Sequence, residues 1–102
     1  MRITFDPAKR EWTLRQRGLD FVDATAVFAG PTFTFEDDRL DYPEVRFVTV
    51  GLLADQMIVL VWTPDPSVVD DEGRRVISMR KANAREQRRL GQRLGQAGRN
   101  RR

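Results

Sequence analysis

The side chains that could do chemistry in this sequence are arginines, lysines and carboxylates, because the chain has no histidine and no cysteine. Histidine is the commonest general base and metal ligand, and cysteine supplies disulfides and thiolate nucleophiles. Their absence excludes a disulfide framework and thiol chemistry and argues against a zinc site. The acidic stretch from Glu36 to Asp41 lacks metal-site spacing and is more often a solvated loop or a landing point for a basic partner. We therefore expect neither a metal ion nor another cofactor.

Basic residues gather towards the end of the chain. Residues 1–73 carry 7 Lys or Arg against 14 Asp or Glu, whereas residues 74–102 carry 11 against a single acid, Glu86. The net charge is therefore −7 in the first segment and +10 in the second. A positive segment of this kind attracts a phosphate backbone, an anionic lipid or an acidic partner, although a solvated helix and tail can look the same.

Two of these basic residues, Arg80 and Lys81, lie where a predicted strand gives way to a predicted helix. Asn83 can cap that helix, with Glu86 three residues later to complete a capping box. Side chains of the strand and backbone N–H groups of the first helical turn can converge on one anion at such a junction. Arg80 has no acidic residue within five positions on either side. We expect it to be free of a salt bridge and able to bind an anion.

The hydrophobic pattern predicts short helices first and strands afterwards. A strand near Ile3 is expected to join the edge of an antiparallel meander formed by residues 32–80. Asp6-Pro7 suits a helix start, and Gly18 and Gly30 suit helix ends. The predicted elements are a strand at Ile3–Phe5, helices at Pro7–Arg17 and from Asp20 to Phe28, strands at Thr32–Glu36, Val45–Leu52, Met57–Thr63 and Arg75–Met79, and a helix from Asn83 through Leu94.

This order of elements predicts an α+β fold. Two N-terminal helices would pack on one face of the antiparallel sheet, the other face would stay open, and a basic C-terminal helix would follow. We expect a single domain over residues 1–94 and a basic flexible tail over residues 95–102. No apolar run approaches the roughly 20 residues that cross a bilayer. We expect a soluble, cytoplasmic protein without membrane contact.

The two tryptophans, Trp12 and Trp62, allow two interpretations. Each could stack on nucleic-acid bases, but a tryptophan in a short helix or an apolar strand more often belongs to the core. The core interpretation is the expectation for both.

Three segments together resemble one protein family. They are FDPAKREWTLRQRGLDFVDATAVFAGP, PEVRFVTVG and RRVISMRKANAREQRRL, and their order and spacing resemble the BrnT toxin family as far as about Leu90. The resemblance implies a RelE-like fold and a ribonuclease that inhibits translation. It also implies a DNA-binding antitoxin of the ribbon-helix-helix type, so that RNA, including ribosome-associated mRNA, would be contacted directly and DNA only through the antitoxin.

The resemblance also suggests site residues. Arg75 and Arg80, followed by Lys81, match arginines of the family's final strand, and Arg46 matches the arginine of its middle strand. The chain departs from the family elsewhere: Phe5 replaces a tryptophan, Gln16-Arg17-Gly18 replaces Lys-His-Gly, and Trp62-Thr63-Pro64-Asp65 replaces a segment that supplies a histidine and an arginine.

Cleavage of RNA by its own 2′-oxygen needs a base, help for the leaving 5′-oxygen and positive charge around the phosphorane-like transition state. Arg46, Arg75 and Arg80 could supply the charge through bidentate contacts, and Lys81 could move the proton only if its surroundings lowered its pKa. Arg46 could instead pair with Glu44 or with an acid of the loop 36–41. Arg75 could likewise pair with one of the acids Asp70, Asp71 and Glu72.

The predicted function is accordingly an RNA-cleaving toxin, with Arg80, Arg75, Lys81 and Arg46 as candidate catalytic residues. One alternative is a degenerate module that binds its antitoxin, and RNA, without cutting. Another is a general nucleic-acid or ribosome-associated protein that acts through its basic helix and tail.

Overall fold

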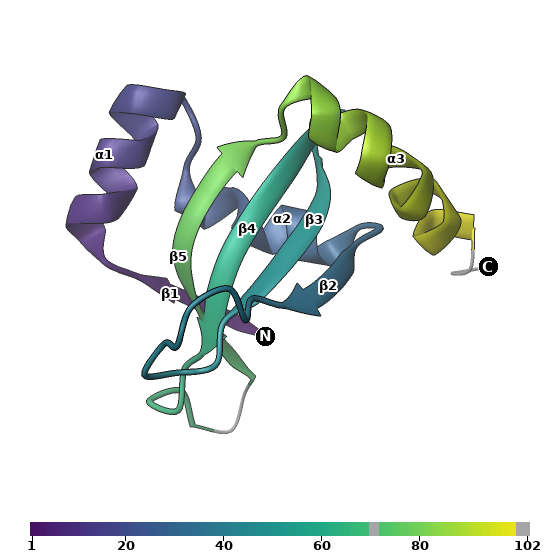
Figure 1. Ribbon diagram of the computed structural model, residues 1–102. Coiled ribbons are helices and arrows are strands. Elements are labelled where there is room, and N and C mark those ends of the chain that lie inside the picture. Colours follow the sequence, from purple (N-terminus) through teal and green to yellow (C-terminus); the bar gives the residue numbers. More distant parts are fainter. Residues whose placement is uncertain (70–71, 100–102) are drawn as a thin grey trace.

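The computed structural model describes residues 1–69 and 72–99, with side chains described as far as Gly95. It shows a mixed α+β fold, as predicted, in which a five-stranded sheet is flanked by helices on both sides (Figure 1). In chain order the elements are β1 (Arg2–Phe5), α1 (Pro7–Arg17), a 3-10 turn η1 (Phe21–Asp23), α2 (Ala24–Ala29), β2 (Phe33–Glu36), β3 (Phe47–Leu53), β4 (Gln56–Pro64), β5 (Gly73–Lys81) and α3 (Ala84–Arg99).

The sheet has the strand order β1-β5-β4-β3-β2. Strands β2 to β5 form the predicted antiparallel meander, and β1 adds to its edge in parallel with β5. The turn between β3 and β4 is shorter than predicted, because Leu53 pairs with Gln56 and leaves only two residues in the loop. Ala54 and Asp55 both have positive φ there, at 49° and 64°, as a type I′ hairpin requires.

Helix α1 begins and ends where the capping residues predict. The Asp6 side chain accepts a hydrogen bond from the Ala8 N–H, Pro7 opens α1, and Gly18 ends it with φ of 68°. The single second helix predicted from Asp20 is wrong in detail: the chain makes the 3-10 turn η1 before α2 begins. The Asp20 side chain caps that turn by accepting a hydrogen bond from the Val22 N–H, and it also binds Arg10. The predicted helix is therefore replaced by the turn η1 followed by α2.

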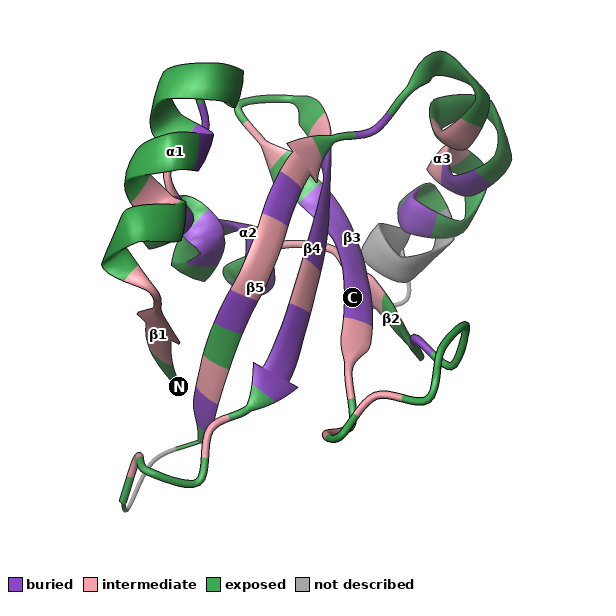
Figure 2. Cartoon of the chain, turned by 60° about the vertical axis from the view of Figure 1, so that its left-hand side comes forward, coloured by how far each residue is buried: buried purple, intermediate pink, exposed green. Residues whose placement is uncertain are grey.

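One face of the sheet, which we call the α2 face, carries the larger part of the core (Figure 2). Phe21, Val27 and Phe28 pack there against the side chains of β4 and β5. Helix α1 lies alongside β5, beyond the short strand β1 (Figure 1). The Arg17 guanidinium donates a hydrogen bond of 2.9 Å to the Met79 carbonyl of β5, which ties the end of α1 to the sheet.

The opposite face, which we call the α3 face, was predicted to be open, and that prediction is wrong. Helix α3 lies over its β2 and β3 side (Figure 2). Leu90 packs into a second apolar cluster with Val48, Val50 and Val59, and Leu94 is also buried. The four-residue spacing of these leucines gives α3 one apolar stripe, and burial of that stripe provides the reason for the docking.

The division into a domain over residues 1–94 and a flexible tail over residues 95–102 remains a prediction. Helix α3 extends to Arg99, beyond the predicted end of the folded part at residue 94, while residues 100–102 lie outside the described part. Within the described ranges, no helix has the length and apolar character needed to span a membrane.

Candidate functional site

Two arginines of β5, Arg75 and Arg80, share one face of the sheet because of a bulge. Val61 pairs with Ser78 and Trp62 pairs with Val76, so Ile77 has no partner on β4. In a regular strand Arg75 and Arg80, five positions apart, would point to opposite faces. The extra residue Ile77 shifts the alternation of side chains by one position, so that Arg75 and Arg80 point to the same face. Arg80 lies opposite Val59 and Arg75 opposite Thr63, and these two β4 residues are on the α3 face.

Arg80 is not free, which corrects the sequence prediction. Its guanidinium donates two hydrogen bonds to the Glu86 carboxylate, at 2.7 and 2.8 Å. Glu86 is six positions away in sequence, but the turn into α3 brings it back over the end of β5. The capping box is confirmed, since the Asn83 N–H donates to Glu86 and the Glu86 N–H donates to the Asn83 side chain. Glu86 therefore both caps α3 and occupies the fork of Arg80.

This pair should make folding stability depend on pH in acid. The Arg80 hydrogen bonds lower the pKa of Glu86 from 4.5 to about 2, against the opposing effect of burial. A carboxylate with a depressed folded-state pKa contributes stability that is complete above the unfolded pKa and is lost as pH falls through the folded value. We expect the melting temperature of wild type to exceed that of Glu86→Gln at neutral pH, and the difference to shrink between pH 4.5 and about 2.

Thermal unfolding followed by circular dichroism at several pH values measures this difference. The matched control is Glu11→Gln, because Glu11 is an exposed carboxylate on α1. A difference between wild type and Glu86→Gln that stays constant over this range would contradict the role of the ion pair.

A cavity of about 370 Å³ lies on the α3 face beside Arg80. Its floor is the valines of β3 and β4 together with Ser78, and its rim is charged. Arg39 and Arg89 join Arg80 on this rim, and sequence reasoning missed both. Acids stand among them: Glu36, Asp37, Asp38 and Glu86. The part of the α3 face that α3 does not cover is thus a hollow with an apolar base and charged walls.

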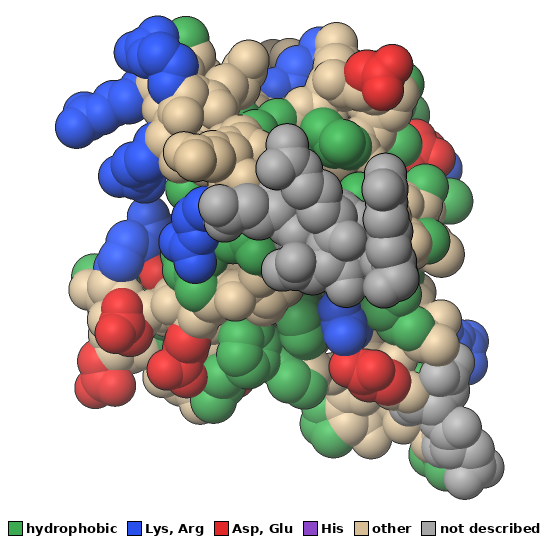
Figure 3. All heavy atoms as spheres, turned by 90° about the vertical axis from the view of Figure 1, so that its right-hand side faces the viewer, with side chains coloured by type: hydrophobic (Ala, Val, Ile, Leu, Met, Phe, Trp, Pro, Cys, Tyr) green, Lys and Arg blue, Asp and Glu red, His purple; other side chains and the backbone are tan. Residues whose placement is uncertain are grey.

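Arg39 reaches this cavity from the loop after β2. It makes a bidentate ion pair with Asp37, with a closest distance of 2.7 Å, and three quarters of its side chain is exposed. The Arg39 hydrogen bonds hold the pKa of Asp37 below its usual value. Basic and acidic groups thus both line this cavity. On the face drawn in Figure 3, Lys and Arg side chains are gathered above a group of Asp and Glu side chains.

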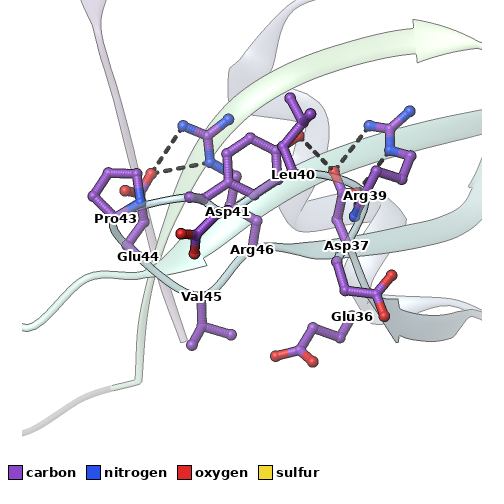
Figure 4. A pocket seen from close by; sticks show the side chains of 11 residues that line it. Glu36, Asp37, Arg39, Leu40, Asp41, Pro43, Glu44, Val45 and Arg46 are labelled. Atoms are coloured by element: carbon purple, nitrogen blue, oxygen red, sulfur yellow. Dashed lines mark hydrogen bonds and ion pairs between the residues drawn. The ribbon is translucent and has the colours of Figure 1, made fainter.

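The structure does not bring Arg46 into this cavity. Arg46 binds Glu44 at 3.0 Å, and its guanidinium lies 4.0 Å from the centre of the Tyr42 ring. These residues line a hollow formed by the loop residues 36–46 (Figure 4). The alternative in which Arg46 pairs with Glu44 is confirmed.

Arg75 is exposed on the α3 face, and its side chain makes no hydrogen bond or ion pair with the described residues. The charge of Arg75 acts on Asp65, whose pKa is lowered to about 2 mainly by hydrogen bonds from Ser67 and Thr4 and more weakly by Arg75. Two of the acids expected to compete for Arg75, Asp70 and Asp71, lie outside the described residues. Arg75 is therefore available to an external anion as far as the structure describes its surroundings.

Lys81 does not join Arg80 at one site. It lies opposite Ile58, whose side chain belongs to the α2 face, so Lys81 and Arg80 point to opposite sides of β5. The Lys81 side chain is exposed and lines a separate hollow with Asp55 and Gln87. The prediction that Arg80 and Lys81 converge on one anion is therefore wrong.

The tryptophans differ from each other. Trp62 is buried, as predicted, and its Nε1–H donates a hydrogen bond of 2.8 Å to Thr49. Trp12 was also expected in the core, and that prediction is wrong: 48% of it is exposed, and the Arg17 guanidinium lies 5.1 Å from its ring centre. The reason is that α1 packs along the edge of β5 and buries only Thr13 completely.

Comparison with known proteins identifies the family. A search of curated proteins finds no match. Residues 5–86 match the family described as the ribonuclease toxin BrnT of a type II toxin-antitoxin system. That match covers most of the chain, including every strand of the sheet from β2 to β5 and the turn that carries Arg80 and Glu86. The chain therefore belongs to the BrnT family of ribonuclease toxins of type II toxin-antitoxin systems.

Proposed function

We propose that this chain cleaves RNA without a metal ion, on the α3 face of β5, and so inhibits translation in the cytoplasm. The observation that carries the proposal is the bulge at Ile77, which places Arg75 and Arg80 on one face of a strand. With a rise of roughly 3.3 Å per residue, the two arginines lie about 15 Å apart along β5 and can contact different phosphates of one RNA strand. Arg39 and Arg89 add positive charge beside Arg80.

Arg80 would carry the main electrostatic role. An RNA phosphate can replace the Glu86 carboxylate in its bidentate fork, because both ligands present two oxygens to the planar guanidinium. The fork is already oriented, so little reorganisation is needed when charge builds up on the phosphorane-like transition state. Arg75 would hold the strand at a second point, while Arg46 and Lys81 stay outside this site.

Glu86 is the carboxylate that binds Arg80 directly, and it could move a proton. Once a phosphate has displaced it, Glu86 loses the Arg80 hydrogen bonds, which are the largest cause of its depressed pKa, and its basicity rises. The carboxylate can then accept the proton of the 2′-hydroxyl as the 2′-oxygen attacks phosphorus. The bond to the 5′-oxygen breaks, water protonates that oxygen, and a 2′,3′-cyclic phosphate remains.

Family membership supports an antitoxin partner, and we propose a ribbon-helix-helix protein that binds α3. The exposed side of α3 carries Arg85 and Arg88, and a negatively charged partner would associate with such a surface quickly and with strong salt dependence. DNA would be reached only through that partner. The charge-reversal pair Arg85→Glu and Arg88→Glu leaves the buried leucines of α3 in place and should slow association with the product of the neighbouring gene.

Induced expression in bacteria, with and without the neighbouring gene, tests the proposed function. Growth arrest and RNA decay should follow expression of the chain alone and should disappear on co-expression. Absence of both effects, with the chain folded and abundant, would overturn the proposal.

A second candidate function is a module that binds its antitoxin and RNA without cutting. It is favoured by the missing histidine, because Arg17 stands where the family commonly has that residue and is engaged by the Met79 carbonyl. Tight binding of RNA by purified chain, combined with no cleavage and no growth arrest, would select this function.

A further inference from the structure

A hollow of about 270 Å³ lies between α1 and β5, apart from the cavity beside Arg80. Six residues line it: Lys9, Trp12, Thr13, Arg17, Ile77 and Ser78. The aromatic ring is held in place on one side, since the Arg17 guanidinium lies over it and is itself anchored to the Met79 carbonyl. About half of the tryptophan is nevertheless exposed, although Thr13 beside it is buried. A large aromatic surface is thus held rigidly at the edge of a hollow.

The charges around this hollow differ from those around Arg80. Lys9 and Arg17 contribute two positive charges, and no carboxylate lines it. The cavity beside Arg80, in contrast, has four acids in its wall. A hollow that combines an aromatic face with positive charge alone suits an anionic ligand that carries a flat apolar group.

The two hollows share one lining residue. Ser78 lines both of them, because the bulge leaves Ile77 and Ser78 together opposite Val61. A strand held by Arg80 would therefore have the Trp12 hollow within reach on the far side of Ser78. Two hollows that share a lining residue of β5 can be occupied by neighbouring nucleotides, and this favours a nucleotide of the same RNA strand as the occupant.

We propose that an unpaired RNA base next to the cleaved linkage enters this hollow and stacks on Trp12, while Lys9 and Arg17 contact its phosphate. The proposal rests on the proposed ribonuclease function and adds a subsite for a single-stranded nucleotide. Stacking on an aromatic side chain accepts any base, so the subsite selects unpaired RNA over duplex and gives little sequence preference.

The test uses equilibrium binding of wild-type chain to a short single-stranded RNA that carries a 2′-deoxy linkage and so cannot be cut. Trp12→Ala should raise Kd by about 5- to 150-fold, the range that loss of one base–aromatic stack produces. Trp12→Phe should keep most of the affinity. RNA should also quench the fluorescence of the exposed Trp12, whereas the buried Trp62 gives a constant background. Leu14→Ala, at an exposed position on the same helix, is the matched control and should change nothing.

An oligonucleotide with abasic sugars in place of bases separates stacking from charge. Wild type and Trp12→Ala should bind it equally, because only the base is missing. Equal affinities of the two proteins for the full RNA, or an unquenched Trp12, would overturn the subsite even if wild type cleaves RNA normally. A loss of antitoxin binding in Trp12→Ala, without a loss of RNA binding, would show that the hollow is a protein contact and would also overturn it. If wild type neither binds nor cleaves RNA, the proposed function itself fails.

Discussion

Replacement of Arg80 by alanine is expected to slow RNA cleavage by about 10²–10³-fold, which is the usual loss when one oriented electrostatic contact to a transition state is removed. Arg80→Lys should recover little of this rate, since an ammonium group cannot grip two phosphate oxygens in a fixed plane. Single-turnover cleavage of an end-labelled RNA measures the chemical step. The fold should survive, because Glu86 keeps its hydrogen bonds with Asn83 at the start of α3.

Arg88→Ala is the matched control for this substitution. It removes the same charge from an exposed position on α3. It should therefore lower affinity slightly at low salt and leave the single-turnover rate at saturating RNA unchanged. Cleavage by Arg80→Ala at the wild-type rate would place the site elsewhere on the molecule.

Replacement of the two neighbouring arginines of β5, Arg74 and Arg75, should affect different properties, namely fold stability and RNA binding. Arg75 faces solvent on the α3 face, so Arg75→Ala should weaken RNA binding and reduce the slope of log K against log salt by about 0.7, the value for one lost phosphate contact with a single strand. Arg74 lies on the α2 face, with its guanidinium 4.7 Å from the Phe28 ring centre and 4.3 Å from that of Trp62. Arg74→Ala should instead destabilise the fold by about 1–2 kcal/mol.

Salt titration of RNA binding and urea unfolding of both variants measure these two effects. Arg74→Ala and Arg75→Ala serve as controls for each other, because each variant removes one arginine from the same strand. Equal changes in salt slope for Arg74→Ala and Arg75→Ala would show that the bulge does not separate their roles.

Local patterns in the sequence were sufficient for the meander and for the starts of α1 and α3. The alternation of apolar residues predicts the strands, and the caps at Asp6 and Asn83 depend on residues at most three positions apart. Family resemblance adds Arg75 and Arg80 as candidates, and both lie on one face. Nothing in composition or spacing predicts that shared face, because a strand drawn without its bulge puts them on opposite sides.

The parts that could not be predicted depend on contacts between distant elements. Arg80 and Glu86 meet only because the chain turns between β5 and α3, and Arg39 reaches the same cavity from a loop forty residues earlier in the chain. The docking of α3 on the sheet depends on the fit of Leu90 among valines of two other strands. The exposure of Trp12 depends in the same way on how α1 lies along β5, which helix propensity does not determine.

We propose that this chain, which has no histidine, cleaves RNA through the α3 face of β5. Incubation of purified chain with a uniform single-stranded RNA in the presence of a strong metal chelator, followed by mass spectrometry of the product ends, tests this proposal. We expect fragments that end in a 2′,3′-cyclic phosphate and begin with a 5′-hydroxyl, formed by wild type and scarcely by Arg80→Ala. Intact RNA, or fragments with 3′-hydroxyl and 5′-phosphate ends, would contradict it.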